Sequence, residues 1–261
     1  MCTLVILRRP GHPWPVLIAA NRDEMVSRPW LPPGPHWPDR PEVIAGQDVQ
    51  AGGTWLGINR HGVVAAVLNG RRSLGPQDGF RSRGELPLEA LDHADASDAA
   101  DALAELNPKA YRSCHIVIAD NRDAFVVSID ENAGRPFVSR TAVPPGLSLL
   151  TAAGLNDTSH ARAKLYLPQF RLAAQPDPET GDWKAWQTLL ASRLHDPAGG
   201  AEGAMLVVTD HGYGTVCSSL IALPAPALPR KPPVFLFAAG RPGEAEFRRV
   251  DTYIDGAPAR A

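Results

Sequence analysis

The sequence is poor in cysteine, in long apolar runs and in net charge. Its 261 residues include three cysteines that lie far apart and form no CxxC pair, so we predict neither a disulfide framework nor a zinc site. We therefore expect a reduced, cytoplasmic protein. No apolar run approaches the roughly 18 residues that a membrane helix needs, and Arg8, Arg9 and Pro10 interrupt the first apolar run. We expect no membrane span and no signal peptide.

The charge balance and the missing motifs restrict the class of partner. Lys and Arg number 26 and Asp and Glu 28, for a net charge of −2, whereas proteins that bind nucleic acid through phosphates are typically basic. The glycine-rich segment 52–57 lacks the spacing of a nucleotide-binding loop, and the eight histidines include no HExxH pair. We predict no nucleic acid, no cofactor and no metal. The expected partner is a small-molecule ligand or substrate, and the oligomeric state stays open.

Short apolar segments, separated by many prolines, dominate the pattern of the chain. Hydrophobic residues make up 44% of the sequence, enough for one sizeable core, and we predict a single domain over residues 1–261. Strands are predicted at 2–7, 16–20, 54–58, 63–68, 115–119, 124–129, 215–222 and 234–238. Helices are predicted at 85–106, 158–167 and 182–194, the second ending at Pro168. Because proline removes a ladder donor, residues 29–42 predict an ordered rim loop.

This order of elements indicates an α+β fold. Strands occur near both ends with helices between them, without the strict alternation of a doubly wound βαβ fold. The strands are apolar throughout, which is typical of sheets covered on both faces.

Cys2 is the first residue with a candidate chemical role. If Met1 is removed, Cys2 carries both a thiol and a free α-amine, which titrates near 7.7–8.0 and can act as a general base. Nucleophile and base then belong to one residue, so the thiol needs no histidine partner to activate it. The alternative is that Cys2 is a small apolar residue that opens a buried strand.

Polar residues follow the predicted strand 16–20 directly, in the sequence Asn21-Arg22-Asp23-Glu24. An antiparallel pairing with strand 2–7 would bring this strand end beside Cys2. There Arg22 could stabilise a thiolate and Asp23 could hold the α-ammonium group. The alternative is a solvated turn with surface ion pairs.

Asn69 ends a buried run and precedes Gly70. Its side-chain amide could donate to an oxyanion, or the pair could form an ordinary Asn-Gly turn. A histidine partner for the cysteine, namely His61, His115 or His211, stays open as a further alternative.

Taken in order, these motifs resemble the NRDE family, whose animal member is the transport and Golgi organisation 2 protein. The matching segments are MCTLVIL, AANRDE, SRPW, AGGTWLGINRHG, VLNGRR and RSRGELPLEAL, within about residues 1–91. The family is similar to the choloylglycine hydrolase and penicillin V acylase group of N-terminal-nucleophile hydrolases. This resemblance implies a four-layer αββα sandwich with the nucleophile on its first strand.

The resemblance also assigns roles by position. Cys2 matches the nucleophile, Arg22 and Asp23 match an arginine and an aspartate on the second strand, and Asn69 matches the first oxyanion asparagine. Two acylase features are missing: the nearest candidate for a second asparagine is Asn156, and residues 214–219 contain no late arginine.

Two functions follow from the resemblance. The first is a cysteine amidohydrolase that cleaves a small linear C–N amide through a thioester on Cys2. The second is a non-enzymatic protein on the same fold that binds or traffics haem or another apolar ligand, since the family has also been tied to haem handling.

Overall fold

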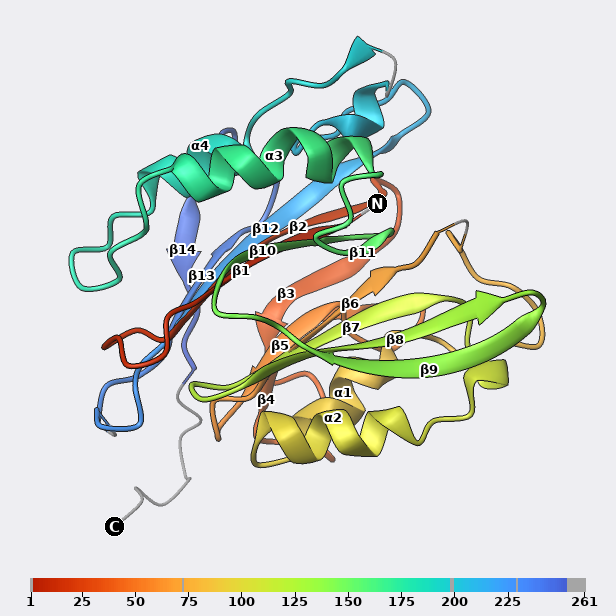
Figure 1. The fold of residues 1–261 in the computed structure, drawn as a ribbon, viewed down its shortest axis with the longest axis horizontal. Coiled ribbons are helices and arrows are strands. Elements are labelled where there is room, and N and C mark those ends of the chain that lie inside the picture. The colour runs from red at the N-terminus through yellow and green to blue at the C-terminus, as the bar shows by residue number, and fades with distance from the viewer. Residues whose placement is uncertain (1, 72, 198–199, 229, 253–261) are drawn as a thin grey trace.

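Two antiparallel sheets pack face to face, and a pair of helices covers the outer face of each (Figure 1). The computed structural model describes residues 2–71, 73–197, 200–228 and 230–252. Met1, on whose removal the catalytic role of Cys2 depends, lies outside this part of the chain. The layering confirms the predicted α+β fold with its four-layer αββα sandwich.

The first sheet carries the N-terminal strand in its interior. Across the described residues it has seven strands in the order β11-β10-β1-β2-β12-β13-β14. Their bounds are β1 (Thr3–Arg8), β2 (Val16–Met25), β10 (Gly146–Thr151), β11 (Gly154–Leu155), β12 (Tyr213–Leu223), β13 (Val234–Ala238) and β14 (Phe247–Arg249). The apolar side chains of β1 alternate between two cores. Leu4 and Ile6 pack between the sheets, whereas Val5 and Leu7 pack under the outer helices.

The second sheet also has seven strands within the described residues, in sequential order from β3 to β9. Their bounds are β3 (Trp30–Gly34), β4 (Val43–Asp48), β5 (Leu56–Asn59), β6 (Val64–Asn69), β7 (Cys114–Ala119), β8 (Ala124–Asn132) and β9 (Arg135–Ala142). The predicted rim loop at residues 29–42 is wrong where β3 forms. The ladder of β3 shifts register between Leu31 and Gly34, and an irregular edge strand is where prolines are tolerated.

Helices cover the two outer faces of the sandwich. The helices α1 (Glu85–Leu91) and α2 (Ala96–Ala104) pack on the second sheet, and α3 (Ala161–Leu172) and α4 (Lys184–Leu190) pack on the first. The predicted stop at Pro168 is wrong, because Pro168 lies inside α3. Leu167 and Phe170 are buried on either side of it. Their burial offsets the roughly 3 kcal/mol that an interior proline costs.

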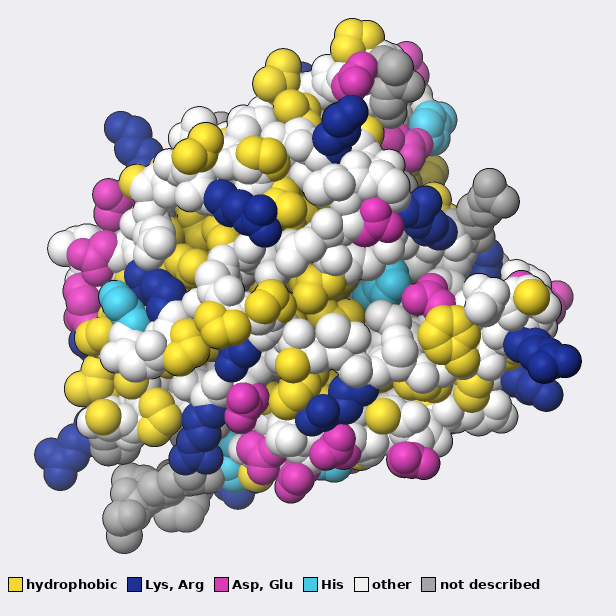
Figure 2. All heavy atoms as spheres, viewed as in Figure 1, with side chains coloured by type: hydrophobic (Ala, Val, Ile, Leu, Met, Phe, Trp, Pro, Cys, Tyr) yellow, Lys and Arg dark blue, Asp and Glu magenta, His cyan; other side chains and the backbone are white. Residues whose placement is uncertain are grey.

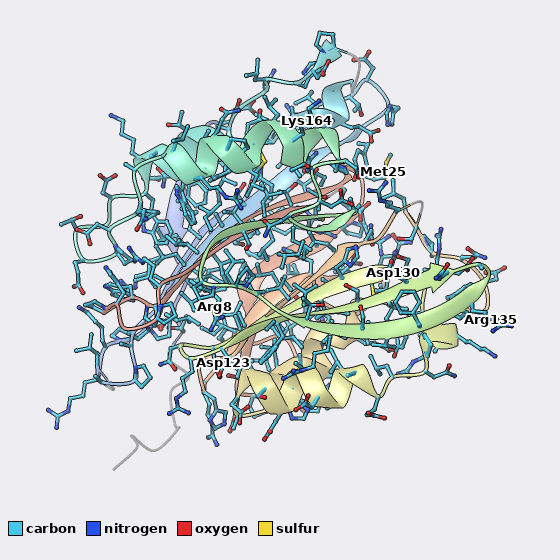
Figure 3. All side chains as sticks on the ribbon, in the orientation of Figure 1. Arg8, Met25, Asp123, Asp130, Arg135 and Lys164 are labelled. Carbon is cyan, nitrogen blue, oxygen red and sulfur yellow. The ribbon has the colours of Figure 1, made fainter. Side chains whose placement is uncertain are left out.

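The two ends of β1 have different surroundings. At its last residue, Arg8 donates to the Val143 carbonyl at 2.5 Å and lies 3.6 Å from Asp123 Oδ1, so it links the two sheets (Figure 3). The first residues of β1 lie instead beside a cleft between the sheets. Acidic and basic side chains are interspersed over the face of the molecule shown in Figure 2.

Candidate active site

Cys2 lies at the mouth of the sandwich, immediately before β1. Its side chain is half-buried, and its Sγ lies 3.7 Å from the backbone carbonyl oxygen of Asp23. Together with Arg22 and Cys217 it lines a narrow cleft that is partly open to solvent. The other walls are mainly apolar and are formed by Leu4, Ala20, Trp55, Leu56, Ala66, Val67 and Leu68. The cleft therefore surrounds two thiols and one guanidinium group with mainly apolar surface.

The polar segment Asn21–Glu24 is not a turn. It forms part of strand β2, and Thr3 lies directly opposite Asn21 in the register of β1 and β2. One step further along this register, Cys2 lies beside Arg22. Figure 3 marks Met25, the last residue of β2, at the edge of the sheet where β1 begins. The structure thus brings Cys2, Arg22 and Asp23 together.

Arg22 is held from two directions. Its side chain is only 5% exposed, its Nη2 donates to Asp48 Oδ2 at 3.1 Å, and its guanidinium carbon lies 4.2 Å from the centre of the Trp55 ring. Asp48 Oδ2 also accepts from Arg28 Nε at 2.6 Å. The Arg22 Nη1 is buried and has no hydrogen-bond partner among the described residues. Since Arg22 lines the cleft, this group is suited to donate to a ligand there.

Gly46 makes room for the Trp55 ring. A Cβ atom on Gly46 would lie 2.3 Å from Trp55 Cη2, which is too close without displacing the ring. We therefore expect Gly46→Ala to destabilise the protein by about 1–3 kcal/mol, as overpacking does, and to shift its tryptophan fluorescence. Urea unfolding measures the first effect. Gly203→Ala is the matched control, because its Cβ would meet the nearest atom at 3.6 Å, and equal stability losses in both variants would contradict the expectation.

Asp23 points to the opposite face of the sheet from Arg22. Its carboxylate is buried under the outer helices, where Oδ2 lies 3.0 Å from Arg162 Nη1 and Oδ1 accepts from Thr215 Oγ1 at 2.7 Å. Arg162 Nη1 also donates to Thr3 Oγ1, and its Nη2 donates to the Glu202 carbonyl at 2.7 Å. Alternation along β2 therefore places Arg22 on the thiol side of the sheet and Asp23 on the helix side.

Arg162 was missed by the sequence analysis, although a signal for it exists. The buried residues of α3 are Arg162, Ala163, Tyr166, Leu167 and Phe170, spaced as on one face of a helix. An arginine within that stripe has to find a buried partner, and Asp23 supplies it. The late strand β12 supplies Thr215 and Tyr213 beside Asp23, with the Tyr213 hydroxyl 3.3 Å from the Asp23 carbonyl oxygen.

The Cys2 thiol is not preactivated by its charged neighbours. Burial and, after it, the negative charge of Asp23 raise its pKa above the usual value of 9.0, and the opposing effect of Arg22 is smaller. The expectation that Arg22 would favour a thiolate is therefore outweighed in the chain that retains Met1. A base must take the thiol proton if Cys2 is to attack a carbonyl.

This raised pKa predicts slow alkylation of Cys2 before Met1 is removed. A raised pKa lowers the thiolate fraction at a given pH, so iodoacetamide should label Cys2 at pH 8 more slowly than in the urea-unfolded chain. The rate should still be rising above pH 9, where an ordinary cysteine approaches its plateau. Peptide mass mapping distinguishes Cys2 from the two buried cysteines. A rate equal to that of the unfolded chain would contradict the expectation.

Asn69 lies at the end of β6 in the opposite sheet, and it is not part of the cleft lining formed by Val67 and Leu68. It is paired with Cys114, whose side chain packs toward α1 and α2. Because directly opposite residues share a face, the Asn69 side chain points to that face as well. The Val67 N–H donates to the Trp55 carbonyl on the β5 side, and the Gly70 N–H donates to the Ser113 carbonyl on the β7 side. Because successive N–H groups along a strand point to alternate neighbours, the Asn69 N–H points to the β5 side.

Asn156 is engaged in the backbone of the first sheet. Its φ of 57° is left-handed, its Oδ1 accepts from the Leu149 N–H at 2.9 Å, and its Nδ2 donates to Ser148 Oγ at 3.1 Å. The side chain thus closes the turn at the edge of β10. It is not among the residues that line the cleft.

The alternative partners of Cys2 lie away from the cleft lining. His115 is buried in β7, with Nδ1 2.8 Å from Ser128 Oγ, and burial lowers its pKa. His61 lies 3.6 Å from Glu42, and His211 stacks on Tyr213. A second thiol, that of Cys217, also lines the cleft. Cys217 lies opposite Arg22 on β12, and burial raises its pKa as well.

No group of three or more His, Cys, Asp or Glu side chains in the described residues could hold a metal ion. No helix among those residues is both long and apolar enough to cross a membrane.

Comparison with solved structures identifies the class of the fold. The sandwich resembles the N-acylethanolamine-hydrolyzing acid amidase ortholog of Caenorhabditis elegans, with a TM-score of 0.54 and 14% identity over 84% of this chain and 92% of that one. It also resembles a mutant of the conjugated bile acid hydrolase from Clostridium perfringens, with a TM-score of 0.54 and 12% identity over 99% of this chain and 95% of that one. The fold is that of the N-terminal-nucleophile hydrolases.

The chain belongs to the Transport and Golgi organisation 2 family, whose family model matches residues 1–225. The Homo sapiens homolog of transport and Golgi organization protein 2 is 40% identical over 72 residues, or 26% of this chain and 25% of that protein. The Mus musculus homolog is 34% identical over 131 residues, or 46% of this chain and 45% of that protein. The matched segments therefore cover less than half of either relative.

Proposed function

We propose that this protein is a cysteine amidohydrolase that cleaves a small linear C–N amide through a thioester on Cys2. The observation that carries the proposal is the position of the Cys2 thiol. It lies in a mainly apolar cleft that Arg22 also lines, and the Nη1 of Arg22 has no hydrogen-bond partner among the described residues. Asp23 lies on the other side of the sheet at the same strand end. Removal of Met1 would place a free α-amine at the same strand end.

The α-amine acts as the base. Its ordinary pKa of about 7.7–8.0 leaves a useful neutral fraction at pH 7, and this neutral amine takes the thiol proton as Sγ attacks the carbonyl carbon. The resulting ammonium group returns the proton to the leaving amine when the C–N bond breaks. Water, activated by the same amine, then hydrolyses the thioester and frees the acid. The raised pKa of the Cys2 thiol is consistent with this need for an adjacent base.

The two charged neighbours act from opposite faces of the sheet. Arg22 Nη1 is directed to the thiol side, where it can donate to an oxygen of the bound acyl group or to the sulfur as it gains charge. The Asp23 carboxylate orients the α-amine from the helix side. An apolar wall around them strengthens both interactions by excluding water.

The register of β6 turns the Asn69 side chain toward the Cys114 face, away from the cleft, so donation from this side chain to the oxyanion is not part of the proposed mechanism. We therefore expect Asn69→Ala to reduce kcat by less than about tenfold. A side-chain donor would instead cost about 10²–10³-fold, and a loss of that size would assign the role to the amide group. Steady-state kinetics on the substrate selected below measures the difference, and thermal unfolding checks that the variant folds.

Intact mass and a substrate panel test the proposal together. Purified protein should lack the mass of Met1, and a panel of N-acyl arylamides with acyl chains of increasing length should show turnover with a mass increase for the acyl-enzyme. Retention of Met1 in the cell, or a protein without Met1 that hydrolyses none of these amides, would overturn the mechanism. Haem titration of the same samples tests the rival proposal. A saturable Soret shift without turnover would favour the haem-binding function predicted from the resemblance.

A further inference from the structure

A buried ion pair lies directly behind the strand that carries the proposed nucleophile. Arg162 from α3 and Asp23 from β2 have side chains that are 1% and 0% exposed, and their Nη1 and Oδ2 atoms are 3.0 Å apart. Charges this deeply buried are costly unless each is paired and hydrogen-bonded. The pair therefore requires an explanation beyond packing.

The arginine joins three separate segments around the start of β1. Its Nη1 contacts both Thr3 Oγ1 and Asp23 Oδ2, and its Nη2 donates to the Glu202 carbonyl. Thr3 directly follows Cys2. The guanidinium group consequently holds Thr3, the residue next to the proposed nucleophile, close to the Asp23 carboxylate.

We infer that Arg162 is a positioning residue of the proposed reaction, which engages the Asp23 carboxylate so that it cannot hold the Cys2 α-amine permanently as an ammonium ion. The inference rests on the proposed function. A lone carboxylate beside the α-amine would favour the charged amine, which cannot accept the thiol proton. A cation on the far side of the same carboxylate opposes that effect and keeps a neutral fraction of the amine available.

The other titratable groups near this strand end do not replace Arg162. Burial, followed by the charge of Arg162, lowers the pKa of His160 to about 4, so this histidine is neutral at pH 7. Burial raises the pKa of Tyr213, which is also neutral. The thiols of Cys2 and Cys217 are protonated for the same reason. The charged side chains that act on these groups include Arg22, Asp23, Glu24, Arg71, Arg83, Asp157 and Arg162, while Asp48 and Arg28 pair with Arg22 and Glu24. Of these, Asp23 and Arg162 form the pair on the helix side.

A titration that needs no substrate tests the inference. Protein without Met1 is labelled with ¹³C-cysteine, and the α-carbon shift of Cys2, followed against pH, reports the pKa of its own amine. Arg162→Met should raise that pKa by about one unit, and Asp23→Asn should lower it by about as much. The double variant should return to within a few tenths of wild type, and Arg162→Lys, which keeps the charge, should stay close to it.

Opposite shifts from the two partners are not expected from a purely structural role. If Arg162→Met does not fold, Asp23→Asn can be compared with the double variant instead. The two differ only in the Arg162 cation, so the amine pKa of the double variant should be about one unit higher than that of Asp23→Asn. Unchanged pKa values, or shifts of the same sign in both single variants, would overturn the inference. Absent hydrolysis with these shifts present would overturn the proposed function alone. Thr215→Val is the matched control, since it removes an uncharged hydrogen bond to Asp23 and should leave the amine pKa nearly unchanged.

Discussion

Cys2→Ala should abolish amide hydrolysis, by about 10⁴-fold or more in kcat, while the protein keeps its fold. The physical reason is that the thiol supplies the nucleophile and no other group in the cleft can replace it once Cys217 is held protonated by burial. Alanine is also small at position 2, so Met1 can still be removed and the α-amine stays in place. The half-buried side chain contributes little to packing, and the free energy of unfolding should change by less than about 1 kcal/mol.

Cys114→Ala is the matched control for this variant. Cys114 is fully buried in the core between the second sheet and the helices α1 and α2, away from the cleft. Its substitution should cost some stability and leave kcat unchanged. Burst kinetics on the selected amide, with intact mass of the trapped acyl-enzyme, measures the outcome. Residual turnover of more than a few per cent in Cys2→Ala would mean that the thioester mechanism is wrong.

The segment Asn21–Glu24 shows how far sequence reasoning reaches at such a site. The apolar patterns of residues 2–7 and 16–20 predict two paired strands, and this pairing places the polar segment beside Cys2, as the register shows. Its secondary structure is harder to predict, because four polar residues after an apolar strand are typical of a turn. The strand continues because each buried side chain has a partner on its own face: Arg22 pairs with Asp48 and Asp23 pairs with Arg162.

Those partners are distant in sequence, which explains what could not be predicted. Asp48 is 26 residues from Arg22, and Arg162 is 139 residues from Asp23. Neither contact can be predicted from a local sequence pattern, because both depend on how the two sheets and α3 pack. The same holds for β9, whose residues are mostly exposed at a sheet edge and carry no apolar alternation. The family resemblance, which identifies residues by motif, could not supply Arg162 because it lies outside the matching motifs.

Arg162→Met should destabilise the protein by about 3–5 kcal/mol, the usual effect of removing one partner from a buried ion pair. The variant removes the Arg162 contact of the buried Asp23 carboxylate and leaves its hydrogen bond from the Thr215 hydroxyl in place. For a chain of this size, such a loss lowers Tm by roughly 6–20 °C. Urea unfolding followed by circular dichroism measures the change in free energy.

The double variant Arg162→Met, Asp23→Asn decides whether the charge or the packing accounts for that loss. With both charges removed, no unpaired ion stays buried, and replacing a buried pair by uncharged groups is often neutral or stabilising. The double variant should therefore be more stable than Arg162→Met alone by at least about 2 kcal/mol, a coupling that a double-mutant cycle measures directly. Additive losses in the two single variants would show that Arg162 stabilises the fold through its contacts with Thr3 and the Glu202 carbonyl instead. A double variant about as stable as wild type would mean that the ion pair contributes little net stability, as expected of charges that are kept for their effect on the proposed amine.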